Sequence, residues 1–172
     1  LSEEDIELFY QGFSNSTLWP LFHYFPNLTT FDDANWKGYV KVNQAFLARL
    51  EQIVKPGDTI WIHDYQLMLL PQLIRSVFPD VTIGFFLHIP FPSYELFRLL
   101  PWRTEILDGL LGSDLIGFHT YDYVRHFLSS VRRLLGVDHE MNSLKYKGRN
   151  IRADVFPMGI DYEYFTRPLN NR

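Results

Sequence analysis

Residues 59–92 read TIWIHDYQLMLLPQLIRSVFPDVTIGFFLHIPFP, and this stretch decides the fold. Residues 59–62 form a short apolar run after a Pro-Gly-Asp turn, and residues 81–87 form a second one. Such runs are typical of strands buried on both faces of a sheet. Between them, residues 67–77 have helical spacing, and Phe78-Pro79-Asp80 stops this helix. A strand, a helix and a second strand joined by short connections predict a parallel sheet.

The same alternation continues on both sides of this stretch. Ser2 is placed to cap a first helix with Asp5 in a variant of the capping box. Further elements are a long amphipathic helix within residues 36–54, short helices from residue 93 and over 104–111, a third strand at 114–118, a helix from Thr120 to about residue 135, and a hairpin or terminal strand between 145 and 156. The sequence therefore predicts an α/β fold, a Rossmann-like, doubly wound parallel sheet with helices on both faces.

Composition narrows the class of protein. Hydrophobic residues make up 47% and aromatic residues 17% of the 172, which is enough for a sizeable core. The formal charge is −4 and the basic residues are scattered, so we expect no nucleic-acid partner. The absence of cysteine excludes disulfides and thiolate metal sites. No apolar run reaches the length of a membrane span, so we expect a soluble, cytoplasmic protein with no membrane partner.

Each of the three predicted strands ends in a histidine. These are His63, which precedes Asp64, then His88 and His119. Open parallel sheets bind ligands at the carboxyl ends of their strands, so the functional site is expected around His63-Asp64 and His88. Histidines and a carboxylate are feasible metal ligands, but rigid or bulky residues follow each histidine. We therefore predict no metal and no cofactor; dinucleotide and triphosphate-binding glycine motifs are absent as well.

Structural explanations compete with the functional ones. His63 is equally explained by hydrogen bonds to backbone groups at the sheet edge, and Asp64 by capping the helix that begins near residue 67. His119 is interpreted as structural, because nothing else near it in the sequence suggests chemistry. Asn43, on the apolar stripe of the long helix, is interpreted as a hydrogen-bonded polar group of the core.

His88 is harder to explain as a structural residue. It follows a mostly apolar run, and Ile89-Pro90-Phe91-Pro92 then fixes the backbone as it leaves the sheet. A rigid exit of this kind suits a sugar site, where hydroxyl groups are recognised by donors and acceptors held in place. Tyr10 and Trp19 lie in a second candidate cluster, because their rings match the mixed apolar and polar surface of a sugar. The alternative is that both are core aromatics at the end of a helix.

Several long motifs carry a family resemblance. They are YQGFSNSTLWPLFHY at residues 10–24, WIHDYQLMLLP at 61–71, FFLHIPFP at 85–92, LLPWR at 99–103, DLIGFHT at 114–120 and FPMGID at 156–161. In this order they resemble the trehalose-6-phosphate synthase family. The resemblance implies a retaining glycosyltransferase of the GT-B type, with two Rossmann-like domains. Such enzymes transfer glucose from UDP-glucose to glucose 6-phosphate, giving trehalose 6-phosphate and UDP.

Roles follow from the resemblance, motif by motif. It implies that Tyr10 binds the acceptor phosphate and that Asp64 binds an acceptor hydroxyl. Trp19 would form a wall of the acceptor pocket and, with Ile89, help to select the anomer. His88 would be the catalytic residue, in contact with the donor glucose where the two sugars meet. Family members are thought to react by front-face displacement, which depends on positioning and charge stabilisation and needs no protein nucleophile.

The resemblance also sets limits. It implies that residues 1–172 are the later part of an N-terminal, acceptor-binding domain; the sequence opens with Leu1 and no Met, and both ends are expected to be cuts through a larger protein. The glycine-rich donor loop and the basic residues of the donor site would lie outside it, so we expect the isolated chain to be inactive. A non-catalytic sugar-phosphate sensor and a synthase with another acceptor, such as glycerol 3-phosphate, stay open. So do a homo-oligomer and a phosphatase domain fused downstream.

Overall fold

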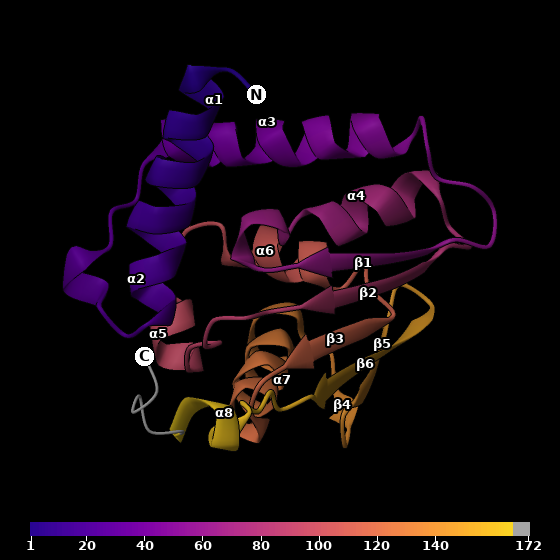
Figure 1. Cartoon of the computed structure of the whole chain (residues 1–172). Helices are drawn as coiled ribbons and strands as arrows, with labels where there is room; N and C mark the ends of the chain where they lie inside the picture. Colours follow the sequence, from indigo (N-terminus) through magenta and orange to yellow (C-terminus); the bar gives the residue numbers. More distant parts are fainter. Residues whose placement is uncertain (167–172) are drawn as a thin grey trace.

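A six-stranded sheet organises the computed structural model, which describes residues 1–166 (Figure 1). The strands are β1 (Thr59–His63), β2 (Thr82–Phe86), β3 (Leu115–Phe118), β4 (His139–Glu140), β5 (Ser143–Tyr146) and β6 (Arg149–Val155), in the order β1-β2-β3-β6-β5-β4. β1, β2, β3 and β6 are parallel, whereas β5 pairs antiparallel with β6 on one side and with β4 on the other. The α/β prediction and the first three strands are confirmed, but the sheet is mixed. Lys147 and Gly148, both at positive φ, join β5 to β6 in a tight turn, which leaves no room for a crossover.

Most helices fall close to their predicted positions, whereas the short ones at residues 26–28 and 162–166 were not predicted. They are α1 (Glu3–Ile6), η1 (Glu7–Leu18), α2 (Trp19–Phe22), η2 (Pro26–Leu28), α3 (Asp33–Leu50), η3 (Tyr65–Leu67), α4 (Leu70–Val77), α5 (Tyr94–Phe97), α6 (Arg103–Leu110), α7 (Tyr121–Leu135) and α8 (Tyr162–Thr166). Ser2 and Asp5 form the predicted capping box of α1. Thr120 precedes α7 as predicted, although its side chain makes no capping hydrogen bond. No helix within residues 1–166 is long and apolar enough to cross a membrane.

The N-terminal helical segment has a form that periodicity does not predict. η1 is a π-helix of 12 residues, wider than an α-helix. It packs closely on α3: a Cβ on Gly12 would collide with the side chain of Asn35, and one on Gly38 with Leu8. Phe13 and Tyr39, both fully buried, pack between these helices with tilted rings whose centroids are 4.6 Å apart. The close approach of two helices therefore fixes this segment, and local propensity does not reveal it.

The helices that pack on the sheet cover one of its faces. Ile62, Ile83, Phe85, Ile116 and Phe118 project to this face and are buried, and Phe118 packs on α7 through Phe127 at 5.4 Å. The prediction of helices on both faces is therefore wrong for residues 1–166. The strand order explains the result, because β1-β2-β3-β6 advances in a single direction. Right-handed crossovers that advance in one direction place their helices on the same side of a parallel sheet.

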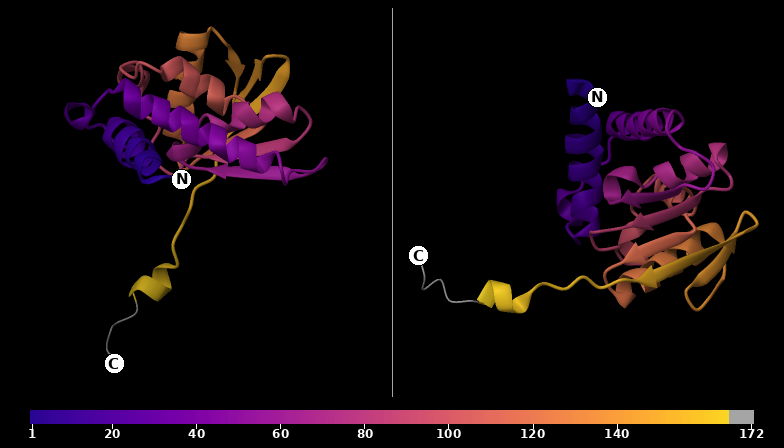
Figure 2. Two further views of the ribbon diagram at one scale, coloured as in Figure 1. Left: turned by 90° about the horizontal axis from the view of Figure 1, so that it is seen from above. Right: turned by 45° about the vertical axis from the view of Figure 1, so that its right-hand side comes forward.

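The opposite face of the sheet is open in the described chain. Trp61 on β1 is 68% exposed and Leu115 on β3 is 37% exposed. The prediction of burial on both faces is thus wrong for β1, where only Ile62 is buried, whereas in β2 Phe85 and Phe86, which project to opposite faces, are both buried. The apolar pattern correctly indicates two faces suited to burial, and residues 1–166 supply helices for one of them. Figure 2 shows the chain after β6 extending away from the body of the fold towards α8.

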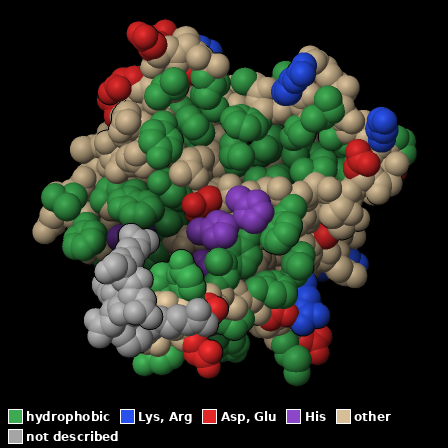
Figure 3. Space-filling view, in the orientation of Figure 1, with side chains coloured by type: hydrophobic (Ala, Val, Ile, Leu, Met, Phe, Trp, Pro, Cys, Tyr) green, Lys and Arg blue, Asp and Glu red, His purple; other side chains and the backbone are tan. Residues whose placement is uncertain are grey.

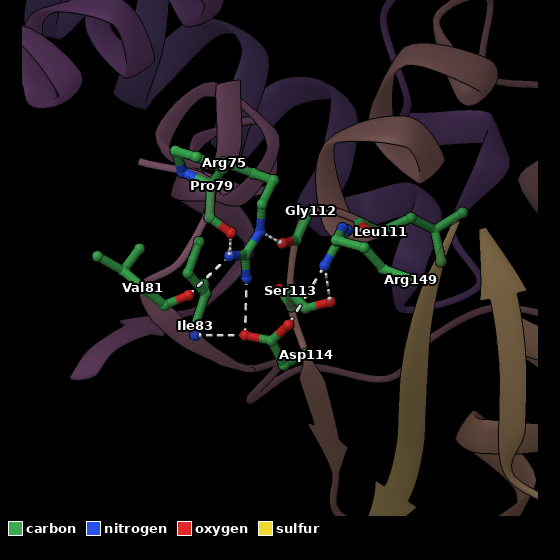
Figure 4. A network of polar contacts seen from close by, with 9 residues as sticks. All are labelled: Arg75, Pro79, Val81, Ile83, Leu111, Gly112, Ser113, Asp114 and Arg149. Carbon is green, nitrogen blue, oxygen red and sulfur yellow. Dashed lines mark hydrogen bonds and ion pairs between the residues drawn. The ribbon is translucent and has the colours of Figure 1, made fainter. Parts of the chain in front are cut away.

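An ion-pair network around the buried Arg75 holds the end of the sheet opposite the histidines (Figure 4). Arg75 of α4, 9% exposed, donates to Asp114 Oδ2 at 2.7 Å, and the same oxygen accepts the N–H of Ile83 at 2.8 Å. The other donors of Arg75 bind the carbonyl oxygens of Pro79, Val81 and Gly112. Arg149 of β6 reaches Asp114 Oδ1 at 3.3 Å. The network ties α4 to the starts of β2, β3 and β6 and so sets the register of the strands whose other ends form the site.

Candidate active site

The N-terminal helical segment stands beside the carboxyl ends of the parallel strands, the side towards which the arrows of β1, β2 and β3 point in Figure 1. The adjoining helix α3 is fastened to the chain after β1 by two contacts of one hydroxyl group. Tyr39 Oη of α3 donates to the carbonyl of Tyr65 at 2.7 Å and accepts the N–H of Met68 at 3.0 Å. Asn43 donates through Nδ2 to Tyr39 O and Gln66 O, which confirms its predicted role as a bonded core residue. The segment after β1 is therefore held rigidly against α3.

Asp64 directly follows β1 and joins two strand ends. Its N–H donates to the carbonyl of Phe86 at 2.8 Å, which extends the pairing of β1 with β2. Its Oδ1 accepts the N–H of Tyr65 at 3.0 Å and the N–H of His88 at 3.2 Å. The predicted capping role is thus confirmed, for η3. The backbone of Asp64 lies at φ 73° and ψ 170°, a region that L-residues rarely adopt. Oδ2 makes no hydrogen bond within residues 1–166 and remains available to a ligand.

The histidines of the three strand ends meet. Nδ1 of His63 lies 2.9 Å from Nε2 of His88, and the two rings are nearly parallel. The His119 ring lies 5.7 Å from that of His88, and Phe86 contacts both His88 and His119. His88 is exposed to solvent on one side, and partial desolvation by its neighbours is the main cause that lowers its pKa; His63 and His119 add to the effect while Asp64 opposes it. His88 is therefore a neutral imidazole at neutral pH.

Trp19 and Tyr10 are surface residues of the same site. Trp19 is 45% exposed and Tyr10 43%, so the alternative that both are core aromatics is wrong. The Trp19 ring lies 5.6 Å from the Tyr65 ring, and Tyr65 Oη donates to Asn15 Oδ1 at 3.0 Å. Burial chiefly raises the pKa of Tyr65 to about 12, with smaller contributions from Asp64 and Tyr10. Tyr65 therefore stays protonated, and it links Trp19, through the ring contact, to Asp64, through its backbone N–H.

Ile89 occupies the rigid exit from β2. It is 4% exposed and belongs to the hydrophobic core together with the fully buried Phe91. The ring nitrogen of His126 in α7 contacts the carbonyl of Phe91 at 3.1 Å, and Tyr24 Oη accepts the N–H of Ser93 at 2.9 Å. Contacts with α7 and with the end of the N-terminal helical segment therefore anchor this exit on both sides. The expected rigidity of the segment after His88 has a structural basis.

An apolar groove of about 690 Å³ runs along the open face of the sheet to the histidines. Trp61, Phe86, Phe156 and Met158 contribute to its lining, and His63 and His88 stand at its end. Figure 3 shows the histidine side chains together on this side of the molecule, among mostly hydrophobic neighbours. Within residues 1–166, no three His, Asp or Glu side chains are arranged as ligands of one metal ion.

Three members of the site were not predicted from the sequence. They are His63 as a partner of His88, Tyr65 as the link to the aromatic cluster, and Asn15 as the acceptor for Tyr65. The pairing of His63 with His88 could have been predicted in part from the sequence. His63 pairs in register with Phe86, and the alternation of side chains along a strand puts His88 on the same face. Tyr65 and Asn15 are 50 residues apart, and only the packing of η1 against η3 brings them together.

Known proteins match the chain closely. The α,α-trehalose-phosphate synthase [UDP-forming] 56 kDa subunit of Kluyveromyces lactis is 52% identical over 98% of this chain, which spans 36% of the length of that relative. A Burkholderia xenovorans α,α-trehalose-phosphate synthase (UDP-forming), solved in complex with glucose 6-phosphate, superposes with a TM-score of 0.87 at 34% identity, over 93% of this chain and 36% of that one. An E. coli protein solved with UDP-2-fluoro glucose gives 0.89 at 39% identity, over 94% and 36%.

The likeness in fold agrees with the GT-B type of domain that the sequence motifs imply. The family model described as glycosyltransferase family 20 matches residues 1–172, so no part of the sequence is left outside it. The strand-end histidines, Asp64 and the exposed aromatics all lie in the matched region. The chain therefore belongs to glycosyltransferase family 20.

Proposed function

We propose that residues 1–172 are part of the acceptor-binding domain of a UDP-forming α,α-trehalose-phosphate synthase. The enzyme transfers glucose from UDP-glucose to glucose 6-phosphate with retention of configuration and releases trehalose 6-phosphate and UDP. The main support is that His88 and Asp64 are joined at the ends of adjacent strands, with the backbone N–H of His88 bonded to the carboxylate of Asp64. The named relative and the solved synthase with glucose 6-phosphate point to the same reaction.

Tyr10, Trp19 and Asp64 form the acceptor side in this proposal. The unbonded Oδ2 of Asp64 accepts a hydroxyl of glucose 6-phosphate, a charge-assisted contact that is stronger than a neutral one. The exposed face of Trp19 packs on the apolar side of the sugar ring, and Tyr10 donates its hydroxyl to the phosphate. Asp64 is held by two strand ends and Trp19 packs on Tyr65, so the acceptor meets groups that are already in position.

His88 and Ile89 face the point where donor and acceptor meet. A neutral His88 binds a hydroxyl of the donor glucose without adding charge, which agrees with its lowered pKa. Ile89, fixed in the core, sets the shape of the wall that selects the acceptor anomer together with Trp19. In a front-face displacement the leaving phosphate takes the proton of the incoming hydroxyl, so the chain contributes position and not a nucleophile.

The test is a UDP-release assay on the complete protein that contains this sequence. UDP-glucose with glucose 6-phosphate should release UDP and give trehalose 6-phosphate, whereas glycerol 3-phosphate should not replace the acceptor. Asp64→Ala removes a charged hydrogen bond worth about 1.5–3 kcal/mol, so the KM for glucose 6-phosphate should rise about 10- to 150-fold. The KM for UDP-glucose should change much less.

Three outcomes would contradict the proposal. Binding of glucose 6-phosphate without any turnover would indicate a sugar-phosphate sensor. Turnover only with glycerol 3-phosphate would indicate a different synthase, and equal losses for both substrates in Asp64→Ala would remove Asp64 from the acceptor side. UDP release by residues 1–172 alone would contradict the expectation that this chain needs the donor half of the site. Cell fractionation would test the cytoplasmic location that the sequence predicts.

A further inference from the structure

The hydrogen bond between two histidine rings is the feature that the proposed reaction does not use. Nδ1 of His63 and Nε2 of His88 are 2.9 Å apart. Such a bond needs one N–H and one lone pair, and a neutral imidazole has one of each. The tautomers of the two rings are therefore coupled, since the nitrogen that donates on one ring decides which nitrogen accepts on the other.

The rings are also held in orientation by their neighbours. Trp61 packs against His63 with ring centroids 4.7 Å apart, and Phe86 packs against His88 at the same distance. The backbone N–H of His88 is bonded to Asp64. Turning either imidazole out of its plane would lose the ring contact, and a half-turn about the Cβ–Cγ bond would break the hydrogen bond, so the observed orientation of the pair is favoured.

This geometry favours one arrangement of the protons. If Nε2 of His88 donates to Nδ1 of His63, both rings carry their proton on Nε2, the form that histidine side chains prefer in water. The reverse arrangement puts both rings in the less favoured form. The titratable groups that face His88 are Asp64, His63 and His119, and their combined effect with burial lowers its pKa. The ring is therefore neutral, as the tautomer argument requires.

We infer that His63 is a positioning residue that fixes the orientation and the tautomer of His88, and so leaves Nδ1 of His88 as a hydrogen-bond acceptor for a hydroxyl of the glucosyl donor. This inference rests on the proposed function for the identity of the ligand. Nδ1 is the free ring nitrogen of His88, because within residues 1–166 it has no hydrogen-bond partner. An acceptor at this point selects a sugar that offers an O–H in that direction.

The experiment compares His63→Phe, His63→Asn and His119→Phe in the complete protein, with two measurements on each. His63→Phe keeps a ring against Trp61 and removes the acceptor, whereas His63→Asn puts an amide group near the position of Nδ1. His119→Phe is the matched control, since His119 contacts the His88 ring without a hydrogen bond to it. The first measurement is the tautomer of His88 by ¹⁵N NMR of labelled histidine, and the second is kcat/KM for UDP-glucose.

In the unmodified protein, Nδ1 of His88 should give the resonance of an unprotonated ring nitrogen. His63→Phe should mix the tautomers and lower kcat/KM for UDP-glucose about 5- to 10-fold, the effect of one neutral hydrogen bond, with the KM for glucose 6-phosphate unchanged. His63→Asn should restore both readouts, and His119→Phe should keep the single tautomer. Mixed tautomers in the unmodified protein, or an unchanged His88 in His63→Phe, would overturn the inference. If the unmodified protein released no UDP, the proposed function would fail, and the NMR measurement would still decide whether His63 controls His88.

Discussion

Replacing Asp64 with glycine and with alanine separates the backbone of this residue from its carboxylate. Both variants lose the hydrogen bonds to the N–H groups of Tyr65 and His88. Only glycine relieves the backbone at φ 73° and ψ 170°, because it has no Cβ to collide with the neighbouring peptide groups. The two variants should therefore lose the same chemistry and differ in stability.

The size of the difference follows from two opposing effects. A non-glycine residue in this region is strained by about 1–3 kcal/mol. Glycine gains extra freedom in the unfolded chain, which costs about 0.5–1 kcal/mol relative to alanine. Asp64→Gly should therefore be more stable than Asp64→Ala by about 0.5–2 kcal/mol in urea unfolding, and both should show the same loss of glucose 6-phosphate use. An alanine variant as stable as the glycine variant would refute the strain argument.

Three further predictions concern charges elsewhere in the chain. Arg75→Met leaves the carbonyl groups of Pro79, Val81 and Gly112 without their side-chain donor. It also removes one of the two cations at Asp114, which keeps Arg149 and the N–H of Ile83. The free energy of unfolding by urea should therefore fall by about 3–5 kcal/mol, and a loss below about 1 kcal/mol would show that the network is dispensable. The pKa of His88 is lower in the folded chain than in the unfolded chain, so the unfolded chain binds more protons as pH falls through about 6.5. The free energy of unfolding should therefore decrease as pH falls through this range, and it should decrease less steeply in His88→Phe. Equal slopes in the two proteins would contradict the pKa shift. A hydrogen bond from Lys41, followed by contacts with Ser2, lowers the pKa of Asp5 to about 2. Lys41→Met should therefore raise the pKa of Asp5 partway towards its usual range, as measured by NMR titration of the carboxyl group. An unchanged pKa would assign the shift to Ser2 alone.

The elements of the fold could be predicted from the sequence because they depend on local patterns. The turn before β1, the proline stops and the apolar runs placed β1, β2 and β3 within two residues of their observed bounds. The covering of the sheet could not be predicted in this way. An apolar run such as residues 81–87 indicates that both faces suit burial, but the direction in which the strand order advances decides where the helices lie. The π-helical form of η1 likewise depends on its fit against α3.

For the candidate site, too, the sequence predicts what depends on local pattern and misses what depends on packing. His88 and Asp64 were expected to meet because strand ends converge in a parallel sheet, and a single hydrogen bond joins them. His63 was left between structural and functional explanations, because sequence does not give the distance between two rings. The structure supplies that distance, with Nδ1 of His63 2.9 Å from Nε2 of His88. Period-two alternation predicts a shared face, but contact depends on side-chain orientation.

The energetics of Asp64 bear on why a carboxylate stands at this position. Its two backbone hydrogen bonds end on a charged oxygen and contribute about 1.5–3 kcal/mol each, whereas the strain of its backbone costs about 1–3 kcal/mol. Strain therefore offsets only part of what the carboxylate adds to stability, and both of these bonds use Oδ1. The remaining difference between the two residues is the unbonded Oδ2, which faces no donor in residues 1–166. A ligand that donates a hydrogen bond to this oxygen adds to the preference for aspartate, and a sugar hydroxyl is such a ligand. A glycine form that still folds cooperatively in urea unfolding but has lost most of its acceptor binding is the pattern that this reasoning requires.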